Sequence, residues 1–479
     1  MHAPGPARGS AQRKSPAAVA RPDPGLQGQS VQSEYVRQAL LAAGFRDAAP
    51  GEEAALCIVN TCTVTLEGDY KSRKLIRQLA RQNPRAPIVV MGCYAARAPG
   101  EVARLPGVVE VWTDKRDLGQ RLHRLGVQHA PAGLRTFGRL HRALVKIQDG
   151  CALGCSYCIV PAVRPALWSR PATEVLAEVR QLLDAGYQEI VLTGIHLGHY
   201  DRGAAASRGG AFQGDAPEQA ATPASSPSQA EAGLRAQRPA GSDALVDLLR
   251  RLVALEGHFR IRLSSLDAME VSDELLGLMA EHPDRLCPHL HLPLQSGSDA
   301  VLRQMRRRST AEAFVDRCRA IRRRLDQPAL TTDVIVGFPG EREADFQATC
   351  RVVEAAGLCR LHVFRFSPRP GTPAADMPNQ IPPKVKRQRA RRLQALSRSL
   401  ASRFAQSLCG RRLEVLVEGQ LPGQPGRFVG TAERYVAVEF SALGLPQGLV
   451  PVTVDGVCRG RLHGHAAVPP MLPLVPQCG

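Results

Sequence analysis

The chain has 479 residues, a formal net charge of +18, a hydrophobic content of 44% and 13 cysteines. This length predicts two or three domains rather than one core, and the apolar content is typical of globular proteins. No apolar run reaches the roughly 18 residues that a membrane span needs, and residues 1–30 lack the apolar segment of a secretory signal. We therefore expect a cytoplasmic protein whose cysteines are thiols or cluster ligands rather than disulfides.

The charge indicates a polyanionic partner. Basic runs lie at residues 303–308, 322–324 and 384–403. Each run alone is more often a solvated helix face, but together with the net charge they favour a nucleic acid. The aromatic content of 4% argues against extensive stacking of bases on aromatic side chains. Structured RNA, held mostly through its backbone, is therefore the expected partner.

The N-terminal part predicts a disordered segment followed by a small domain. Residues 1–30 are rich in Ala, Gly, Pro, Arg and Gln without a period, which is typical of disorder. Residues 31–128 then alternate helical stretches, such as 71–81, with short apolar runs that read as buried strands. These strands are expected at 54–60, 87–91 and 108–112. The alternation predicts a parallel α/β domain.

Residues 137–390 repeat this alternation on a larger scale. Amphipathic helical segments, such as 173–185 and 311–325, separate six apolar strand candidates. The strands are expected at 143–147, 189–192, 259–263, 289–294, 331–336 and 360–366. Six strand–helix units predict a partial (β/α) barrel with its functional groups at the carboxyl ends of the strands. Residues 201–242, which contain almost no large apolar side chains, are expected to form a disordered insertion.

The last segment, residues 410–465, changes to short strands separated by Gly and Pro turns. The strands are expected at 413–417, 427–431, 436–440, 449–454 and 460–462. Five short strands predict a small β-barrel of the kind that commonly binds RNA.

The strongest chemical signal is the spacing of Cys151, Cys155 and Cys158, with Tyr157 before the last cysteine. Three thiolates can hold a [4Fe–4S] cluster and leave one iron open to a small chelating molecule. A structural zinc site would need a fourth Cys or His and usually pairs of C-x2-C, and no such pair lies nearby. The spacing therefore favours the cluster over zinc.

This cysteine pattern resembles that of the radical S-adenosylmethionine (SAM) enzymes. Over nearly its whole length the chain resembles the methylthiotransferases of that group, and most closely the branch that acts on N6-threonylcarbamoyladenosine at position 37 of tRNA. The segment 194–198, Gly-Ile-His-Leu-Gly, is similar to that branch. The resemblance is also carried by residues 60–65, 91–94, 146–151, 192–198, 262–266, 289–298 and 333–341.

The resemblance implies a reaction and its cofactors. The first cluster would bind SAM and cleave it to a 5′-deoxyadenosyl radical, which removes the hydrogen from C2 of adenine in the anticodon loop. A second [4Fe–4S] cluster in the N-terminal domain would supply the sulfur, which another SAM methylates. An electron donor protein and a sulfur source are implied as partners, and the C-terminal barrel would be a TRAM-like RNA-binding domain. The residues implied to contact SAM are Tyr157, Thr193, Gly194, Ser265, Gln295 and Asp333.

The second cluster departs from the family. Cys62 and Cys93 fit two of its three ligands, but the first cysteine and the apolar strand before it are missing, so the domain reads as truncated. Residues 26–34 stand where that cysteine is expected. Cys57 is a poor substitute, because a thiol five residues earlier on a strand points to the opposite face from Cys62. Either the chain start is misassigned, which we favour, or the second cluster is lost.

Two alternatives to a tRNA methylthiotransferase remain. One is a methylthiotransferase for a ribosomal protein, against which the segment 194–198 and the basic charge argue. The other is an RNA-binding radical SAM protein that has lost thiolation. Two further departures are Pro165, where the family usually has Gly, and Trp168, where it usually has Arg. Proline fixes φ and removes an N–H, so we expect an altered loop after the first cluster.

Overall fold

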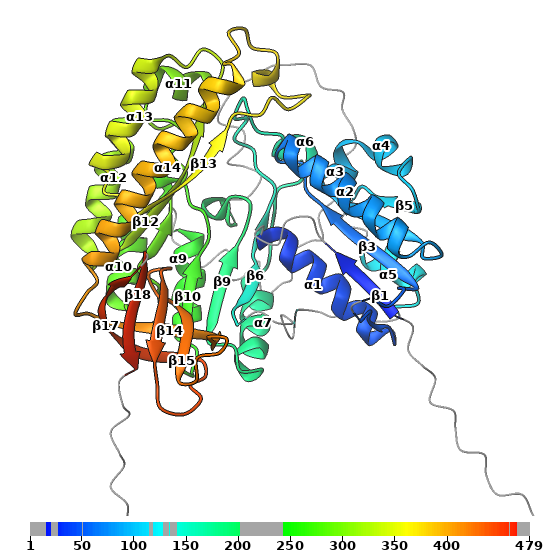
Figure 1. Cartoon of the computed structure of the whole chain (residues 1–479), viewed down its shortest axis with the longest axis horizontal. Coiled ribbons are helices and arrows are strands. Elements are labelled where there is room, and N and C mark those ends of the chain that lie inside the picture. Colours follow the sequence, from blue (N-terminus) through cyan, green and yellow to red (C-terminus); the bar gives the residue numbers. More distant parts are fainter. Residues whose placement is uncertain are drawn as a thin grey trace, which may run out of the picture. The chain divides into compact units, whose positions relative to one another are not determined.

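The computed structural model describes residues 16–20, 27–49, 51–114, 118–127, 134, 141–201, 243–458 and 460–466 (Figure 1). The chain divides into two compact units, Met1–Leu134 and Arg135–Gly479. The predicted insertion at 201–242 lies outside the described residues except for Asp201. In the described part of the chain, no helix combines the length and apolarity needed to cross a membrane.

The first unit is a five-stranded parallel sheet in the order β2-β1-β3-β4-β5. Its elements are β1 (Pro16–Ala20), α1 (Gln27–Ala42), β2 (Arg46–Asp47), β3 (Leu56–Thr61), α2 (Leu66–Gln82), β4 (Ile88–Gly92), α3 (Cys93–Arg97), α4 (Pro99–Ala103), β5 (Val108–Trp112) and α5 (Leu118–Arg124). Strands β3 and β4 are buried along their whole length, as expected for a sheet covered on both faces.

Strand β1 corrects two expectations. The strand that precedes α1 is present, so the prediction that it is missing is wrong. Disorder over residues 1–30 is likewise wrong for 16–20 and 27–30, which form β1 and the start of α1. Pairing explains the difference, because Ala17–Ala20 lie in register with Leu56–Val59 of β3. A short Ala-rich segment has little strand preference alone but gains it between two neighbouring strands.

The second unit contains the predicted partial barrel, and this prediction is confirmed. Two parallel three-stranded sheets, β6-β9-β10 and β11-β12-β13, are joined by isolated bridges such as Ser265↔His291. The strands are β6 (Ala143–Lys146), β9 (Glu189–Thr193), β10 (Arg260–Leu263), β11 (His289–His291), β12 (Ala329–Val336) and β13 (Arg360–Arg365). Strand β11 is shorter than predicted, since Pro293 has no N–H to continue the ladder.

Helices cover the outside of this barrel (Figure 1). They are α7 (Ala172–Asp184), α9 (Ala244–Val253), α10 (Asp273–Glu281), α11 (Asp299–Gln304), α12 (Ala311–Arg324), α13 (Glu343–Ala355) and α14 (Pro383–Gln406). After β6 come the short strand β7 (Gln148–Asp149), helix α6 (Val160–Val163) and strand β8 (Trp168–Ser169), which pairs with β7. The loop between β7 and α6 carries the three-cysteine motif.

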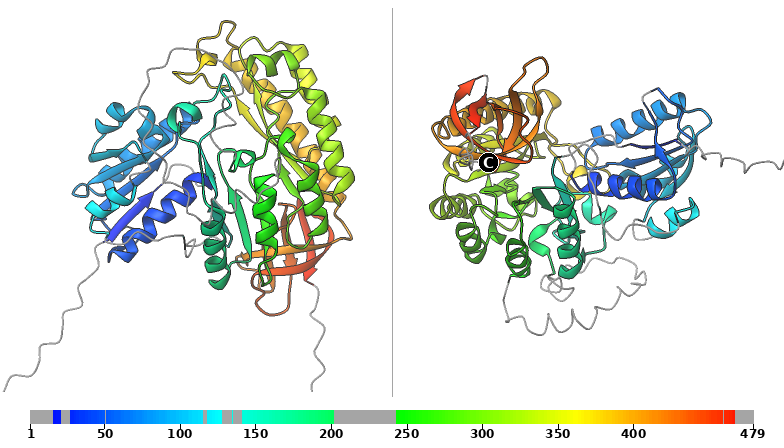
Figure 2. Two further views of the ribbon diagram at one scale, coloured as in Figure 1. Left: turned by 180° about the vertical axis from the view of Figure 1, so that it is seen from behind. Right: turned by 90° about the horizontal axis from the view of Figure 1, so that it is seen from below.

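The C-terminal strands form a closed barrel in the order β14-β15-β16-β18-β17, which confirms the predicted small β-barrel. They are β14 (Arg412–Gln420), β15 (Arg427–Ala432), β16 (Ala437–Ser441), β17 (Leu449–Cys458) and β18 (Arg461–Ala466). This barrel, orange to red in Figures 1 and 2, lies at the end of the partial barrel where strand β10 begins. A shared core of side chains such as Phe428, Phe440 and Val452 fills it.

Two buried arginines join the two barrels. Arg260 and Arg262 of β10 both bond the carboxylate of Glu189 on β9, at 2.7 Å and 3.1 Å from their Nε atoms. Their remaining N–H groups donate to carbonyl oxygens of the C-terminal barrel, including Thr431 at 2.9 Å and Glu433 at 2.8 Å. The buried charges are therefore both paired and hydrogen-bonded, which burial of charge requires.

Candidate active site

The loop that carries Cys151, Cys155 and Cys158 begins at Gly150, directly after β7. Gly150 has φ +80°, and a Cβ at this position would lie 2.2 Å from the carbonyl oxygen of Ala166. Only glycine therefore allows the chain to turn here against residue 166. All three thiols are partly exposed at the mouth of the barrel, at the carboxyl end of its first strand, as the barrel rule predicted.

Burial raises the pKa values of two of these thiols. The pKa of Cys158 is raised to about 12, and the pKa of Cys151 is also raised, in both cases mainly by burial. Metal ligation deprotonates thiols outright. The donor set fits an iron–sulfur cluster, because a single loop carries three partly exposed thiols.

A hydrogen-bonded pair lies beside the first of these cysteines. The Nδ1 atom of His196 is 3.8 Å from Sγ of Cys151, and its Nε2 atom is 2.6 Å from a carboxylate oxygen of Glu270. Gln148 links this pair to the cysteine loop, since its side chain accepts from the His196 N–H at 2.8 Å and donates to the Gly150 carbonyl at 2.8 Å. Nothing in the sequence pattern indicated a role for Glu270, which is 74 residues from His196.

Among the side chains predicted to contact SAM, three lie near the cysteine loop. Tyr157 is within it and packs against a small cluster that includes Met305 and Phe366. Thr193 ends β9 and is buried, and its carbonyl accepts from the Ile147 N–H at 2.9 Å. A Cβ on Gly194 would come within 3.0 Å of Gln148, so the backbone passes close to that side chain. Their contact with SAM stays a prediction.

Ser265 follows β10, Gln295 follows β11, and Asp333 lies within β12. Ser265 bridges to His291, and the Gln295 N–H donates to the Asp333 carbonyl at 2.9 Å. Gln295 has φ +69°, a strained value for a residue other than glycine. Its side-chain oxygen is buried and has no hydrogen-bond partner among the described residues. A buried acceptor of this kind suits a polar ligand.

Asp333 has a more specific environment than the sequence indicated. Its carboxylate lies 3.2 Å from Nε2 of His291 and 3.5 Å from Nδ1 of His362. The ring of His291 is fixed by a 2.9 Å contact between its Nδ1 atom and the Thr331 hydroxyl. His289 is buried, and burial holds its pKa well below the usual value, whereas His291 faces Asp333.

In the first unit, Cys62 and Cys93 follow adjacent strand ends. Thr61 of β3 and Gly92 of β4 are register partners, and each cysteine comes directly after one of them. Both thiols are buried, and helix α2 begins close to Cys62, whose Sγ accepts from the Val64 N–H at 3.4 Å. Two thiols at one sheet edge fit two ligands of a cluster.

A third cysteine for this site is not found in the chain before Cys57. Cys57 itself is fully buried in β3 and packs with Val59 and Ile76, so it is a core residue. Strand β1 precedes α1 in the expected position. The absence of the first cysteine is therefore not explained by a missing strand. The residues of this unit therefore supply two of three cysteine ligands and do not fit a three-cysteine [4Fe–4S] site.

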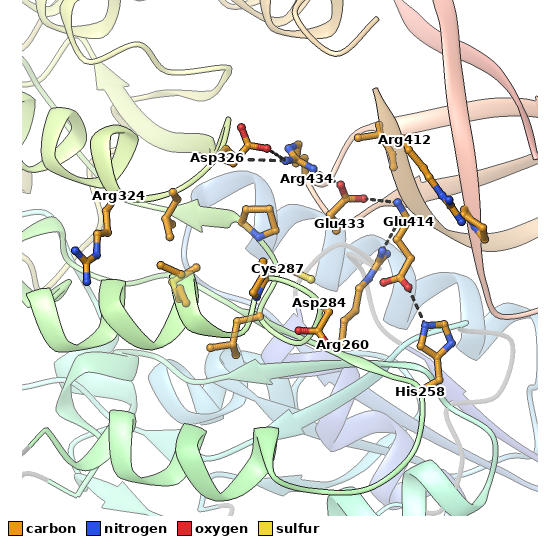
Figure 3. A pocket seen from close by; sticks show the side chains of 18 residues that line it. His258, Arg260, Asp284, Cys287, Arg324, Asp326, Arg412, Glu414, Glu433 and Arg434 are labelled. Atoms are coloured by element: carbon orange, nitrogen blue, oxygen red, sulfur yellow. Dashed lines mark hydrogen bonds and ion pairs between the residues drawn. The ribbon is translucent and has the colours of Figure 1, made fainter. Parts of the chain in front are cut away.

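A separate pocket of about 750 Å³ lies between the partial barrel and the C-terminal barrel (Figure 3). Its charged side chains bond mostly to one another, for example His258 to Glu414 at 2.8 Å and Arg434 to Asp326 at 3.3 Å. We interpret this pocket as part of the interface between the two barrels and assign no chemistry to it.

Comparison with known proteins agrees with this geometry. Residues 145–353 match the Radical SAM superfamily, and residues 25–114 match a family described as Uncharacterized protein family UPF0004. The threonylcarbamoyladenosine tRNA methylthiotransferase MtaB of Bacillus subtilis is 36% identical over 433 residues, which cover 85% of this chain and 87% of that protein. The MtaB of Thermotoga maritima is 33% identical over 427 residues, covering 85% and 88%.

A further tRNA-modifying relative and a solved structure also resemble the chain. A tRNA-2-methylthio-N(6)-dimethylallyladenosine synthase of Corynebacterium urealyticum is 33% identical over 446 residues, covering 88% of this chain and 77% of that one. The structure of the radical SAM methyltransferase TsrM from Kitasatospora setae aligns with a TM-score of 0.50 at 14% identity, over 76% of this chain and 77% of that chain, which shows a shared fold. The chain is a transferase that belongs to the radical SAM methylthiotransferase family.

Proposed function

We propose that this chain converts N6-threonylcarbamoyladenosine at position 37 of tRNA to its 2-methylthio derivative. The observation that carries the proposal is the three-cysteine loop at the mouth of the partial barrel, in a chain whose relatives named MtaB are aligned over most of its length. The net charge of +18 suits a tRNA substrate, and a tRNA substrate implies a cytoplasmic location.

Cys151, Cys155 and Cys158 would hold the [4Fe–4S] cluster. When bound, this cluster with SAM supplies the one-electron cleavage that starts radical chemistry. Gly150 and Gln148 hold the cysteine loop in place, and Gln295, Thr193, Gly194, Ser265, Tyr157 and Asp333 are the proposed polar and backbone contacts to SAM. An exposed anticodon-loop base is already single-stranded and can enter such a site without breaking a pair.

The test of this proposal is nucleoside analysis. Deletion of the gene is expected to remove the 2-methylthio mark from tRNA nucleosides measured by mass spectrometry, and the plasmid-borne chain is expected to restore it. A chain with Cys151→Ala serves as the matched negative control. An unchanged nucleoside profile after deletion would refute the proposed substrate, and a mark lost from a ribosomal protein instead would support the ribosomal-protein alternative.

The incomplete cysteine set in the first unit favours a second candidate. With only Cys62 and Cys93 at that sheet edge, the chain would bind RNA and carry a radical site without completing thiolation. Anaerobically reconstituted protein is then expected to hold about four irons per chain, whereas two clusters would give about eight. Cys62→Ala with Cys93→Ala would leave a four-iron protein unchanged but would lower an eight-iron protein to about four. The electron donor is a proposed partner in both candidates, whereas the sulfur source is a proposed partner in the first candidate only.

A further inference from the structure

Arg307 stands in a run of three arginines between α11 and α12, but its environment differs from that of its neighbours. Arg306 and Arg308 are exposed, whereas the Arg307 side chain is 8% exposed. Its Nη2 atom donates to a carboxylate oxygen of Asp267 at 2.6 Å and to the Pro293 carbonyl at 3.1 Å. The guanidinium is therefore held on one side by two fixed acceptors.

The other side of this guanidinium faces the cysteine loop. The Arg307 charge interacts electrostatically with the Cys155 thiol and with the Tyr157 phenol. Burial raises the pKa of Cys151, and the Arg307 charge acts on that thiol in the opposite direction. One arginine thus acts on two of the three cysteines of the loop.

Backbone contacts fix this arrangement. The N–H of Ser156, the residue after Cys155, donates to the Met305 carbonyl at 3.1 Å, and the Ser156 hydroxyl donates to the Gln304 carbonyl at 2.7 Å. The cysteine loop is therefore tied to the chain two and three residues before Arg307. A change in the length of either segment would separate the guanidinium from Cys155.

A positive charge at this place has a chemical consequence. The reduction potential of an iron–sulfur cluster depends on its net charge, on hydrogen bonds to its sulfur atoms and on its exposure to solvent. Arginine remains protonated at every accessible pH, so its charge is constant. Uptake of one electron from a low-potential donor makes the cluster more negative, and a nearby cation stabilises that reduced form.

We propose that Arg307 is a positioning residue that raises the reduction potential of the SAM-binding cluster through its fixed, buried charge near Cys155. Asp267 holds Arg307 in place and partly offsets this charge. The proposal rests on the assignment of the cluster to Cys151, Cys155 and Cys158 and is independent of which tRNA nucleoside is modified.

The experiment is a redox titration followed by EPR on the full-length, anaerobically reconstituted protein. The signal of interest is identified by its change when SAM is added. Arg307→Gln is expected to shift the midpoint potential to a more negative value, whereas Asp267→Asn is expected to shift it to a more positive value. Arg308→Gln removes the same charge from an exposed neighbour and is expected to leave the midpoint potential unchanged.

Opposite shifts in these two variants distinguish electrostatic control from a structural defect, which would move both variants in the same direction. Iron content, measured in parallel, shows whether each variant holds its cluster. If Arg307→Gln fails to bind iron, the sign of the shift in the midpoint potential of Asp267→Asn decides between electrostatic control and a structural defect. An unchanged midpoint potential in iron-loaded Arg307→Gln, or an unchanged or more negative one in Asp267→Asn, would overturn the proposal. Neither readout depends on tRNA.

Discussion

At the scale of single residues, the cysteine loop depends on a backbone conformation as much as on its thiols. Gly150 turns the chain where Ala166 leaves no room for a side chain, and Gly154 turns it again with φ +26° in open space. The two glycines therefore test different things. A side chain at position 150 would clash with a backbone atom of Ala166. A side chain at position 154 would clash with nothing and would cost only the strain of a positive φ.

We expect Gly150→Ala to lower the iron bound at the SAM-binding site, because the new Cβ forces residue 150 or the Ala166 carbonyl to move. Strain of this kind costs about 1–3 kcal/mol locally. Gly154→Ala is the matched control and is expected to retain more iron. Iron content and the EPR signal after reconstitution are measured for both variants. Equal iron in wild type and Gly150→Ala would show that the loop tolerates the displacement.

Glu189 is the second single residue on which the fold depends. Burial opposes its ionisation, but Arg262 and Arg260 outweigh burial and hold its pKa well below the ordinary value of 4.5. A depressed folded-state pKa means that the ion pairs contribute their full stability above about pH 4.5 and lose it as the pH falls. Removing the carboxylate would leave two buried guanidinium groups without their anionic partner.

We expect Glu189→Gln to lower the free energy of unfolding at pH 7 by about 3–5 kcal/mol. The difference from wild type should shrink as the pH falls below about 4.5. Urea unfolding can be followed by tryptophan fluorescence in a Trp112→Phe background, so that Trp168 reports on the second unit. Glu174→Gln, at an exposed position of α7, is the control and should change little. A difference that stays constant with pH would contradict the ion-pair account.

At the scale of elements, the basic run in α14 differs from the basic run at 303–308 in its exposure. In the run at 303–308, Arg307 is buried against the cysteine loop. In α14, four cations point to one side of the helix and are exposed, and none has an acidic partner within ion-pair distance in the described part of the chain. They are Lys384, Arg387, Arg391 and Arg398. Spacings of three, four and seven residues place such side chains in one row.

This row suits the phosphates of a tRNA substrate. We expect the triple variant Arg387→Gln, Arg391→Gln and Arg398→Gln to weaken tRNA binding and to reduce its salt dependence by roughly two to three units of log K per log salt. The matched control removes three arginines that already have acidic partners, Arg250, Arg319 and Arg392. Fluorescence anisotropy with tRNA at several salt concentrations measures both. Equal salt slopes in the two triple variants would exclude the row from the RNA interface.

At the scale of the whole molecule, the sequence predicted what depends on local spacing. The three cysteines, the six barrel strands and the five C-terminal strands all follow from patterns within short windows. Contacts between distant segments could not be predicted in this way. Glu270 reaches His196 across 74 residues, and nothing in the run 306–308 indicates which arginine is buried. Strand β1 was missed because its neighbours in the sheet, rather than its own residues, make it a strand.

The docking of the C-terminal barrel has a practical consequence for experiments that delete it. Tyr435 of this barrel lies over Arg262 at 5.0 Å and beside the His289 ring at 5.0 Å, at the base of the partial barrel. A chain cut before β14 would expose Arg260, Arg262 and Glu189 to water. It would also remove the carbonyl oxygens to which the two arginines donate. Loss of activity in such a shortened protein would therefore report on folding, and the contribution of this barrel to substrate recognition is better measured with point substitutions on its outer surface.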